Sequence, residues 1–203
     1  MLKTLFVLST ALCLSTTFAK GKKTAATAET LKVDTAASSI TWQGFKKVGA
    51  HHIGKINIKS GQIEMKAGKI IGGEFVIDMA SITNEDLKNN PEYHTKLLTH
   101  LKSADFFDVA KYPTAEFKIT SVHEKAGKTW INGKLTLKDK TEALDFPATI
   151  ESKGGVVTGK AKIEVDRTKW GVIYGSGNFI KELTADKIIN DKFELDLDLV
   201  AKK

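Results

Sequence analysis

Apolar and polar residues alternate along most of the chain from residue 39 onward, in runs separated by turn signals. A period of two is typical of β-strands, in which successive side chains point to opposite faces of a sheet. The last run is the most regular, because every apolar position in it is followed by an acidic one until Leu199. Such runs predict strands over 39–45, 55–66, 71–79, 115–119, 131–138, 144–150, 157–165 and 193–199.

The second of these runs changes phase near residues 60–61. Ile56 and Ile58 fall on one phase, whereas Ile63 and Met65 fall on the other. One extra residue in a strand produces this shift, and the resulting bulge bends the strand. We therefore expect a bulge here, of the kind that the closure of a barrel requires.

A single helical pattern interrupts the strands over 91–102. Asn90 is a good N-cap and Pro91 suits the first helical position. Tyr93, Leu97 and Leu101 are spaced four apart, so we expect the face that they share to cover the barrel.

The fold class predicted from these elements is all-β with a short helical insertion. Most connections are short, which makes neighbouring strands antiparallel. Eight such strands close most simply into an up-and-down barrel, which leaves no free sheet edge. A sandwich of two sheets is the alternative.

The barrel interior is either filled by side chains or open to one small ligand. Small residues on the inward phase favour an open interior, although they could instead relieve crowding where the wall bends. The pattern alone leaves both alternatives open for Gly73, Ala115, Gly133, Gly159 and Ala161.

The N-terminus is typical of an export signal. Lys3 supplies a positive charge, residues 5–14 are mostly apolar, and Ala19 ends a suitable cleavage site. We predict a signal peptide over 1–19, a disordered spacer over 20–30, one domain over 31–203, and a periplasmic or secreted location. Cys13, the only cysteine, lies inside the predicted signal, so the mature chain has no thiol for disulfides, metal binding or nucleophilic attack.

The formal net charge is +7, but the lysines are spread along the chain. We interpret them as solvated strand faces, so no nucleic-acid partner is expected.

The sequence also lacks the motifs of common catalysts and metal sites. It contains no His-Glu-x-x-His, no glycine-rich phosphate loop and no Gly-x-Ser-x-Gly, since the residues at 175–177 lack that spacing. We therefore predict neither a metal nor a cofactor, and no enzymatic activity.

Three separated segments resemble signatures of the YceI-like family. They are HLKSADFFDV at 100–109 with KYP at 111–113 and Phe117, GKLTLK at 133–138, and RTKWGV at 167–172. The resemblance covers about residues 31–200. It implies a lipocalin-like barrel, exported in bacteria, that binds a polyisoprenoid or similar amphiphilic lipid with its tail in the apolar interior.

The inward phase and the resemblance together predict the ligand-binding residues. Arg167, the only arginine, could clamp a phosphate or carboxylate, or form a structural ion pair. The tryptophans could line a cavity or belong to the core, and Phe106 and Phe107 could plug one barrel end or contact the ligand. The predicted set comprises Trp42, Phe75, Ile77, Phe117, Ile119, Ile131, Gly133, Leu135, Phe146, Ala161, Ile163, Arg167 and Trp170.

The function predicted is that of an exported, non-catalytic protein that sequesters or carries an isoprenoid-type or other amphiphilic lipid. A transient contact with a membrane surface and a homodimer both stay open. A glycan-binding or polar-ligand module, using aromatics such as Trp130 and Tyr174, is the alternative, and a hydrolase would need an acid–base pair in the cavity. We expect Gly133→Leu or Ala161→Leu to reduce lipid uptake more than folding.

Overall fold

The computed structural model describes residues 27–203, so the predicted signal peptide lies outside the described residues. Eight of the nine strands of one sheet form the barrel wall, every neighbouring pair is antiparallel, and β9 returns to pair with β2. This closure confirms the predicted barrel rather than the two-sheet sandwich. The strands are β2 (Ser39–Phe45), β3 (His51–Lys66), β4 (Lys69–Asp78), β5 (Thr114–Lys125), β6 (Lys128–Leu137), β7 (Lys140–Lys153), β8 (Val156–Asp166) and β9 (Lys192–Lys202).

A short strand that the pattern did not predict, β1 (Glu29–Val33), completes the wall. It pairs with the second half of β3 and the end of β9, whereas β2 pairs with the first half of β3. The Asp34 carboxylate accepts the backbone N–H groups of Ala36 and Ala37 in the turn between β1 and β2. β1 and β2 therefore lie end to end between β3 and β9, separated by this turn, and together act as one strand of the barrel wall.

The predicted bulge in β3 is confirmed. The register between β3 and β4 shifts between Ile58 and Ser60, so Ile58 and Ile63 both end up buried although their phases differ. A strand bent in this way can follow the curvature of a closed wall.

The barrel wall is not hydrogen-bonded along its whole length. β7 pairs with β8 only from Ala148–Ala161 to Lys153–Val156, so residues 140–147 and 162–166 form no ladder with each other. We call this gap in the ladder the β7–β8 seam. Pro147, which lacks an N–H donor, lies where the seam begins.

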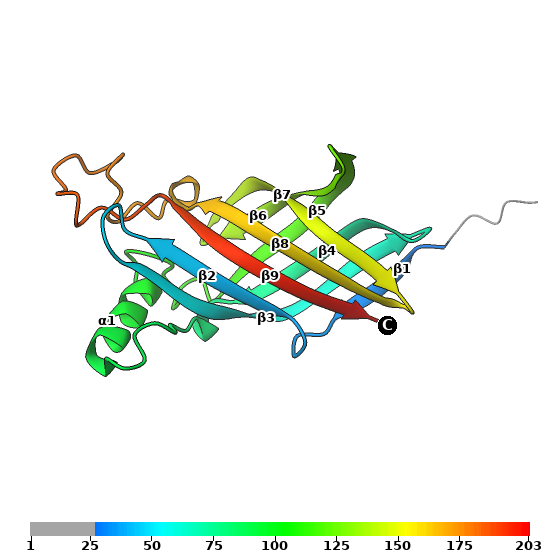
Figure 1. Ribbon diagram of the computed structural model, residues 1–203, viewed down its shortest axis with the longest axis horizontal. Coiled ribbons are helices and arrows are strands. Elements are labelled where there is room, and N and C mark those ends of the chain that lie inside the picture. The colour runs from blue at the N-terminus through cyan, green and yellow to red at the C-terminus, as the bar shows by residue number, and fades with distance from the viewer. Residues whose placement is uncertain (1–26) are drawn as a thin grey trace, which may run out of the picture.

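The two ends of the barrel differ in how the strands are connected (Figure 1). At the end near β1 and the C-terminus, tight hairpins join β3 to β4, β5 to β6 and β7 to β8, and both central residues of each hairpin have positive φ. This geometry is that of the turns that match the twist of paired strands. At the other end lie the β2–β3 loop, α1 (Pro91–Lys102) and the long β8–β9 connection. We call these the turn end and the loop end.

Helix α1 has the predicted bounds, and the Asn90 side chain accepts the N–H of Tyr93 as its N-cap. Its expected packing is only partly right. Leu101 packs against the core, but Tyr93 is 58% exposed. The helix buries no residue fully. Its last turn packs against the core through Leu101, and His94 Nε2 in its first turn lies 3.3 Å from the Asn84 carbonyl of the β4–β5 connection. Within residues 27–203, no helix is long and apolar enough to span a bilayer.

Candidate ligand cavity

The inner faces of the strands enclose a cavity of about 140 Å³ in the middle of the barrel. Its lining is aliphatic and aromatic. Lys160 also borders it, but the Lys160 ammonium points outward and lies 2.7 Å from an Asp198 carboxylate oxygen. Nine predicted residues line the cavity: Phe75, Ile77, Phe117, Ile119, Ile131, Leu135, Phe146, Ala161 and Ile163.

More than half of the residues that line the cavity were not among the predicted ligand-binding residues. Strands β2, β7 and β9 contribute Ile40, Leu144, Ile150, Leu195 and Leu197 among others. These residues follow the same alternation as the predicted ones, so the signal was present in the sequence. Extending the inward phase to every strand of a closed barrel would have found them.

Three phenylalanine rings form a chain across the interior. The ring centroids of Phe75 and Phe117 lie 6.4 Å apart, and those of Phe117 and Phe146 lie 5.6 Å apart. Phe75 and Phe117 are only partly buried although both face inward. Inward side chains with exposed surface indicate that the middle of the barrel is not filled to the density of a core.

The small inward residues play two different roles. A Cβ atom built on Gly133 would lie 2.2 Å from Cζ of Phe117 and 2.7 Å from the Lys118 carbonyl oxygen. Gly133 therefore makes room for the Phe117 ring and does not line the cavity. A Cβ atom on Gly159 would meet nothing closer than Leu199 Cβ at 3.8 Å, and Gly159 and Ala161 both border the cavity. Our expectation for Gly133→Leu is corrected accordingly, because Phe117 already occupies that space.

Trp42 and Trp170 do not line the cavity but close the loop end of the barrel. The Trp42 indole donates to the Thr83 carbonyl at 3.0 Å, and the Trp170 indole donates to the Leu135 carbonyl at 2.9 Å. Both side chains are buried. Phe106 is also buried at this end, and Phe107 packs against the core, as expected of residues that plug one barrel end.

Arg167 also lies outside the cavity. Its guanidinium donates to three backbone carbonyls: Asn190 at 3.1 Å, Val172 at 2.7 Å and Ile189 at 3.0 Å. Burial lowers the pKa of this guanidinium, and the charges of Asp191 and Asp166 oppose that shift. Because these carbonyls come from both ends of the β8–β9 connection, Arg167 fastens the two ends of that connection together.

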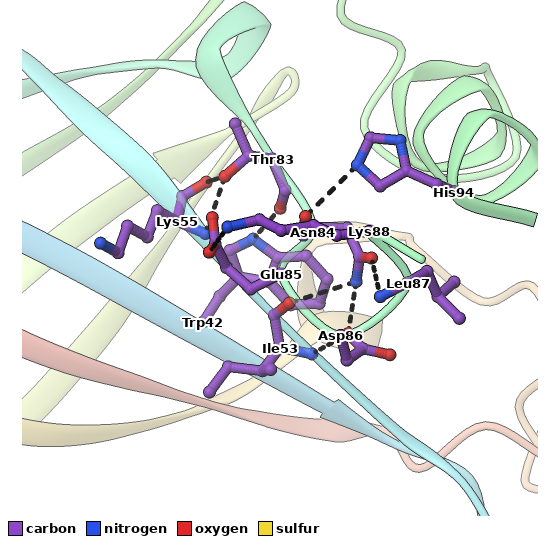
Figure 2. A network of polar contacts seen from close by, with 10 residues as sticks. All are labelled: Trp42, Ile53, Lys55, Thr83, Asn84, Glu85, Asp86, Leu87, Lys88 and His94. Atoms are coloured by element: carbon purple, nitrogen blue, oxygen red, sulfur yellow. Dashed lines mark hydrogen bonds and ion pairs between the residues drawn. The ribbon is translucent and has the colours of Figure 1, made fainter. Parts of the chain in front are cut away.

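A polar network holds the start of the β4–β5 connection against β3 (Figure 2). The buried Asn84 amide donates to the Ile53 carbonyl at 3.1 Å and accepts the Leu87 N–H at 2.9 Å. Asp86 accepts the Ile53 N–H at 2.9 Å and lies 2.8 Å from His52 Nδ1. Burial opposes ionisation of Asp86, but these hydrogen bonds outweigh it and lower the pKa of the carboxyl. The network thus fixes the segment that covers the loop end.

The candidate catalytic features do not converge in the part of the chain that the structure describes. No three His, Cys, Asp or Glu side chains gather as metal ligands within residues 27–203. Among the described residues that border the cavity, none is a histidine, an aspartate or a glutamate.

Trp130, the aromatic suggested for a glycan site, lies across the ladder from His123 on β5 and Pro147 on β7. Its ring is partly buried, with the Lys125 ammonium 5.5 Å from the ring centroid.

The fold and cavity define a class: a closed, eight-stranded antiparallel barrel with an apolar interior space at mid-length. The comparison with protein families agrees with this class, because the YceI-like domain matches residues 31–201. The chain belongs to the YceI-like family.

Relatives share the family name over parts of their length. A UPF0312 protein of Shewanella denitrificans is 31% identical over 103 residues, which cover 50% of this chain and 51% of the relative. Protein YceI of Escherichia coli O6:H1 is 45% identical over 60 residues, which cover 30% of this chain and 29% of the relative. The match to the first of these relatives therefore spans about half of that relative's length, and the match to the second spans less.

Solved structures share the barrel over most of its length. BcnA of Burkholderia cenocepacia is 26% identical with a TM-score of 0.65, and the match covers 84% of this chain and 99% of that one. A polyisoprenoid binding domain of Saccharophagus degradans, implicated in plant cell wall breakdown, is 13% identical with a TM-score of 0.59, covering 85% and 97%. The latter likeness concerns the fold alone.

Proposed function

We propose that this protein binds an amphiphilic lipid, with an isoprenoid-type or similar apolar tail held in the barrel cavity. The observation that carries the proposal is the cavity itself, which lies at mid-barrel and is lined by aliphatic and aromatic side chains. An apolar space of this kind stays dry and takes up apolar groups, because burying apolar surface contributes about 25 cal/mol per Å².

The size of the cavity sets a condition on the ligand. About 140 Å³ is close to the volume of engineered cavities that hold benzene, so a short apolar segment fits without rearrangement. A longer tail needs the interior side chains to move. Phe75 and Phe117 are suited to this, because both are only partly buried and their rings already have free surface beside them.

We further propose that the protein is exported and acts without catalysis, by sequestering or carrying the lipid in the periplasm or outside the cell. The apolar lining supports binding rather than turnover, because a hydrolase needs titratable groups at the reacting atoms. The S. degradans neighbour, which is a polyisoprenoid binding domain, supports the choice of lipid class.

Native mass spectrometry of protein purified from its host, followed by lipid extraction, tests the proposal. We expect an added mass that disappears on denaturation and corresponds to an extracted prenyl lipid. Protein stripped of lipid should then take up a fluorescent prenyl lipid with a stoichiometry of about one. A uniformly empty barrel that also rejects prenyl lipids would overturn the proposal.

A further inference from the structure

Exposed apolar side chains gather at the loop end of the barrel. Val48, in the β2–β3 loop, and Phe179, in the β8–β9 connection, are each 57% exposed, and Ile173 and Tyr174 in the same connection are also exposed. At the turn end, by contrast, Ile71 is the only large apolar side chain within residues 27–203 that is exposed to this degree. Soluble surfaces rarely concentrate apolar groups in this way unless they meet a partner.

The two segments that carry these side chains lie side by side. Lys46 forms a β-bridge with Ile189, the Lys47 N–H donates to the Ile188 carbonyl at 2.9 Å, and the Asn190 N–H donates to the Phe45 carbonyl at 2.8 Å. We call residues 46–48 and 173–187 the loop-end face. Figure 1 shows the β8–β9 connection extending beyond the barrel at this end.

The loop-end face is held on a fixed support. Arg167 fastens the two ends of the β8–β9 connection, and Ser176 inside it is fully buried. Tyr174 also contacts the α1 side of the barrel, with its ring centroid 4.5 Å from that of His100 and 5.5 Å from that of Phe106. The exposed side chains therefore belong to a loop that is held in place by hydrogen bonds and packing contacts.

The two segments that carry these apolar side chains also carry lysines. Lys46, Lys47, Lys181 and Lys187 are exposed, against Glu182 and Asp186 as the acidic residues of the face. In the described chain, none of the four lysines lies within ion-pair distance of a carboxylate. Hydrogen bonds from Thr184 and from its own backbone lower the pKa of the Asp186 carboxyl, and the charges of Lys187 and Lys46 add to this shift. Asp186 therefore offsets part of the positive charge, but four lysines against two carboxylates leave the face positively charged.

We propose that the loop-end face docks on an anionic lipid membrane surface. Aromatic and aliphatic side chains such as Phe179 and Val48 enter the interface between headgroups and acyl chains, while the lysines contact the lipid phosphates. A second copy of the chain fits less well, because two such faces would bring lysines against lysines. Docking does not require an occupied cavity, so this inference goes beyond the proposed function.

The β7–β8 seam opens at the same end of the barrel. Leu144 on β7 and Ile163 on β8 flank the seam, and both border the cavity. Trp170 lies above it, with its indole bonded to the Leu135 carbonyl. A barrel docked through the loop-end face would therefore present this unpaired part of its wall near the membrane, with Trp170 covering it.

Flotation with vesicles tests docking. Wild-type protein is mixed with vesicles of phosphatidylcholine alone or of phosphatidylcholine with phosphatidylglycerol. We expect binding to the anionic vesicles only, and loss of binding at high salt. Phe179→Ser should weaken binding about tenfold, and the double variant Lys46→Gln/Lys47→Gln about thirtyfold.

Matched variants at the turn end serve as controls. Ile71→Ser removes an exposed apolar side chain, and Lys66→Gln/Lys153→Gln removes two exposed lysines, outside the proposed face. Both should bind anionic vesicles within about twofold of wild type. Equal losses in the control variants would mean general attraction of a cationic protein and would overturn the proposal.

Two further outcomes also overturn it. One is that the wild type binds neither vesicle composition. The other is a wild-type dimer that Phe179→Ser dissociates, which would assign the face to a second copy. Lipid uptake by the same variants is measured separately by native mass spectrometry. If the protein carries lipid but does not bind vesicles, the docking inference fails and the proposed function remains supported. If it binds vesicles but takes up no lipid, the proposed function fails and the docking inference remains supported.

Discussion

The middle of the barrel and its loop end have the same kind of inward-facing sequence but opposite packing. At mid-barrel, Phe75 and Leu144 keep exposed surface beside the cavity. At the loop end, Val165 is 0%, Trp170 1% and Val172 0% exposed. The difference comes from the connections, because the segments after β4 and β8 place side chains into the barrel mouth. No comparable segment within residues 27–203 enters the middle.

The largest effect that would test this comparison is expected at Trp170. Trp170→Ala should lower the free energy of unfolding by about 3–5 kcal/mol, because it leaves a cavity in a filled region and removes the bond to the Leu135 carbonyl. Trp130→Ala, on the outer face, is the control and should cost about 1 kcal/mol. Urea unfolding measures both values, and equal losses would contradict a filled loop end.

The next effect separates two inward glycines. Gly133→Ala should destabilise the protein by about 1–3 kcal/mol, because the new Cβ would meet the Phe117 ring and the Lys118 carbonyl. Gly159→Ala should be neutral or stabilise by up to about 1 kcal/mol, because its Cβ has room and alanine restricts the unfolded chain. Thermal melts measure the stability of both variants. If the two lost similar stability, the conclusion that Phe117 covers Gly133 whereas Gly159 borders free space would be wrong.

Filling the cavity should change stability less than it changes binding. Ala161→Leu places a larger apolar side chain in space that the ligand tail is proposed to occupy. The free energy of unfolding should change by less than about 1 kcal/mol, whereas affinity for a prenyl lipid should fall about tenfold. Melts of the lipid-free protein and a fluorescent prenyl-lipid titration measure the two quantities. A large loss of stability with unchanged affinity would mean that the mid-barrel is a filled core.

The smallest effect concerns acid stability at the loop end. The pKa of Asp86 is lowered from its ordinary value of 3.8, since bonds from Ile53, His52 and Asn84 outweigh the burial that opposes ionisation. Its contribution to stability is therefore present above pH 3.8 and is lost as the pH falls through the lowered value. Asp86→Asn should remove a contribution of under about 1 kcal/mol above this range, because the site is partly solvated.

Unfolding free energies measured from neutral pH down to acid, compared with those of Asp86→Asn, check this dependence. The difference between the two proteins should shrink as the pH falls. A difference that stays constant down to the most acidic condition would contradict a role for Asp86 ionisation, and would point to the lost backbone contact alone.

The outline of the barrel could be predicted from local rules. Alternation with a period of two located β2 to β9, the phase change in β3 located the bulge, and Asn90 with Pro91 located the start of α1. Each of these features depends on residues that are neighbours in the chain. β1 escaped prediction because five residues do not establish a period against a polar background.

What the sequence by itself determined is therefore most of the residues that face inward. The start of β4 is an exception, because a register shift between Glu64 and Met65 brings Ile70 to the cavity and leaves Ile71 exposed. Which of the inward-facing residues line a cavity depended on distant contacts: Phe117 covers Gly133, the segments that close the loop end bury Trp170, and Arg167 bonds to carbonyls 5 to 23 residues away. Packing density and the positions of loops depend on contacts between residues that are distant in the chain. An alternating pattern of apolar and polar residues is the same whether the barrel interior is filled or empty. Only the tertiary structure decided that difference.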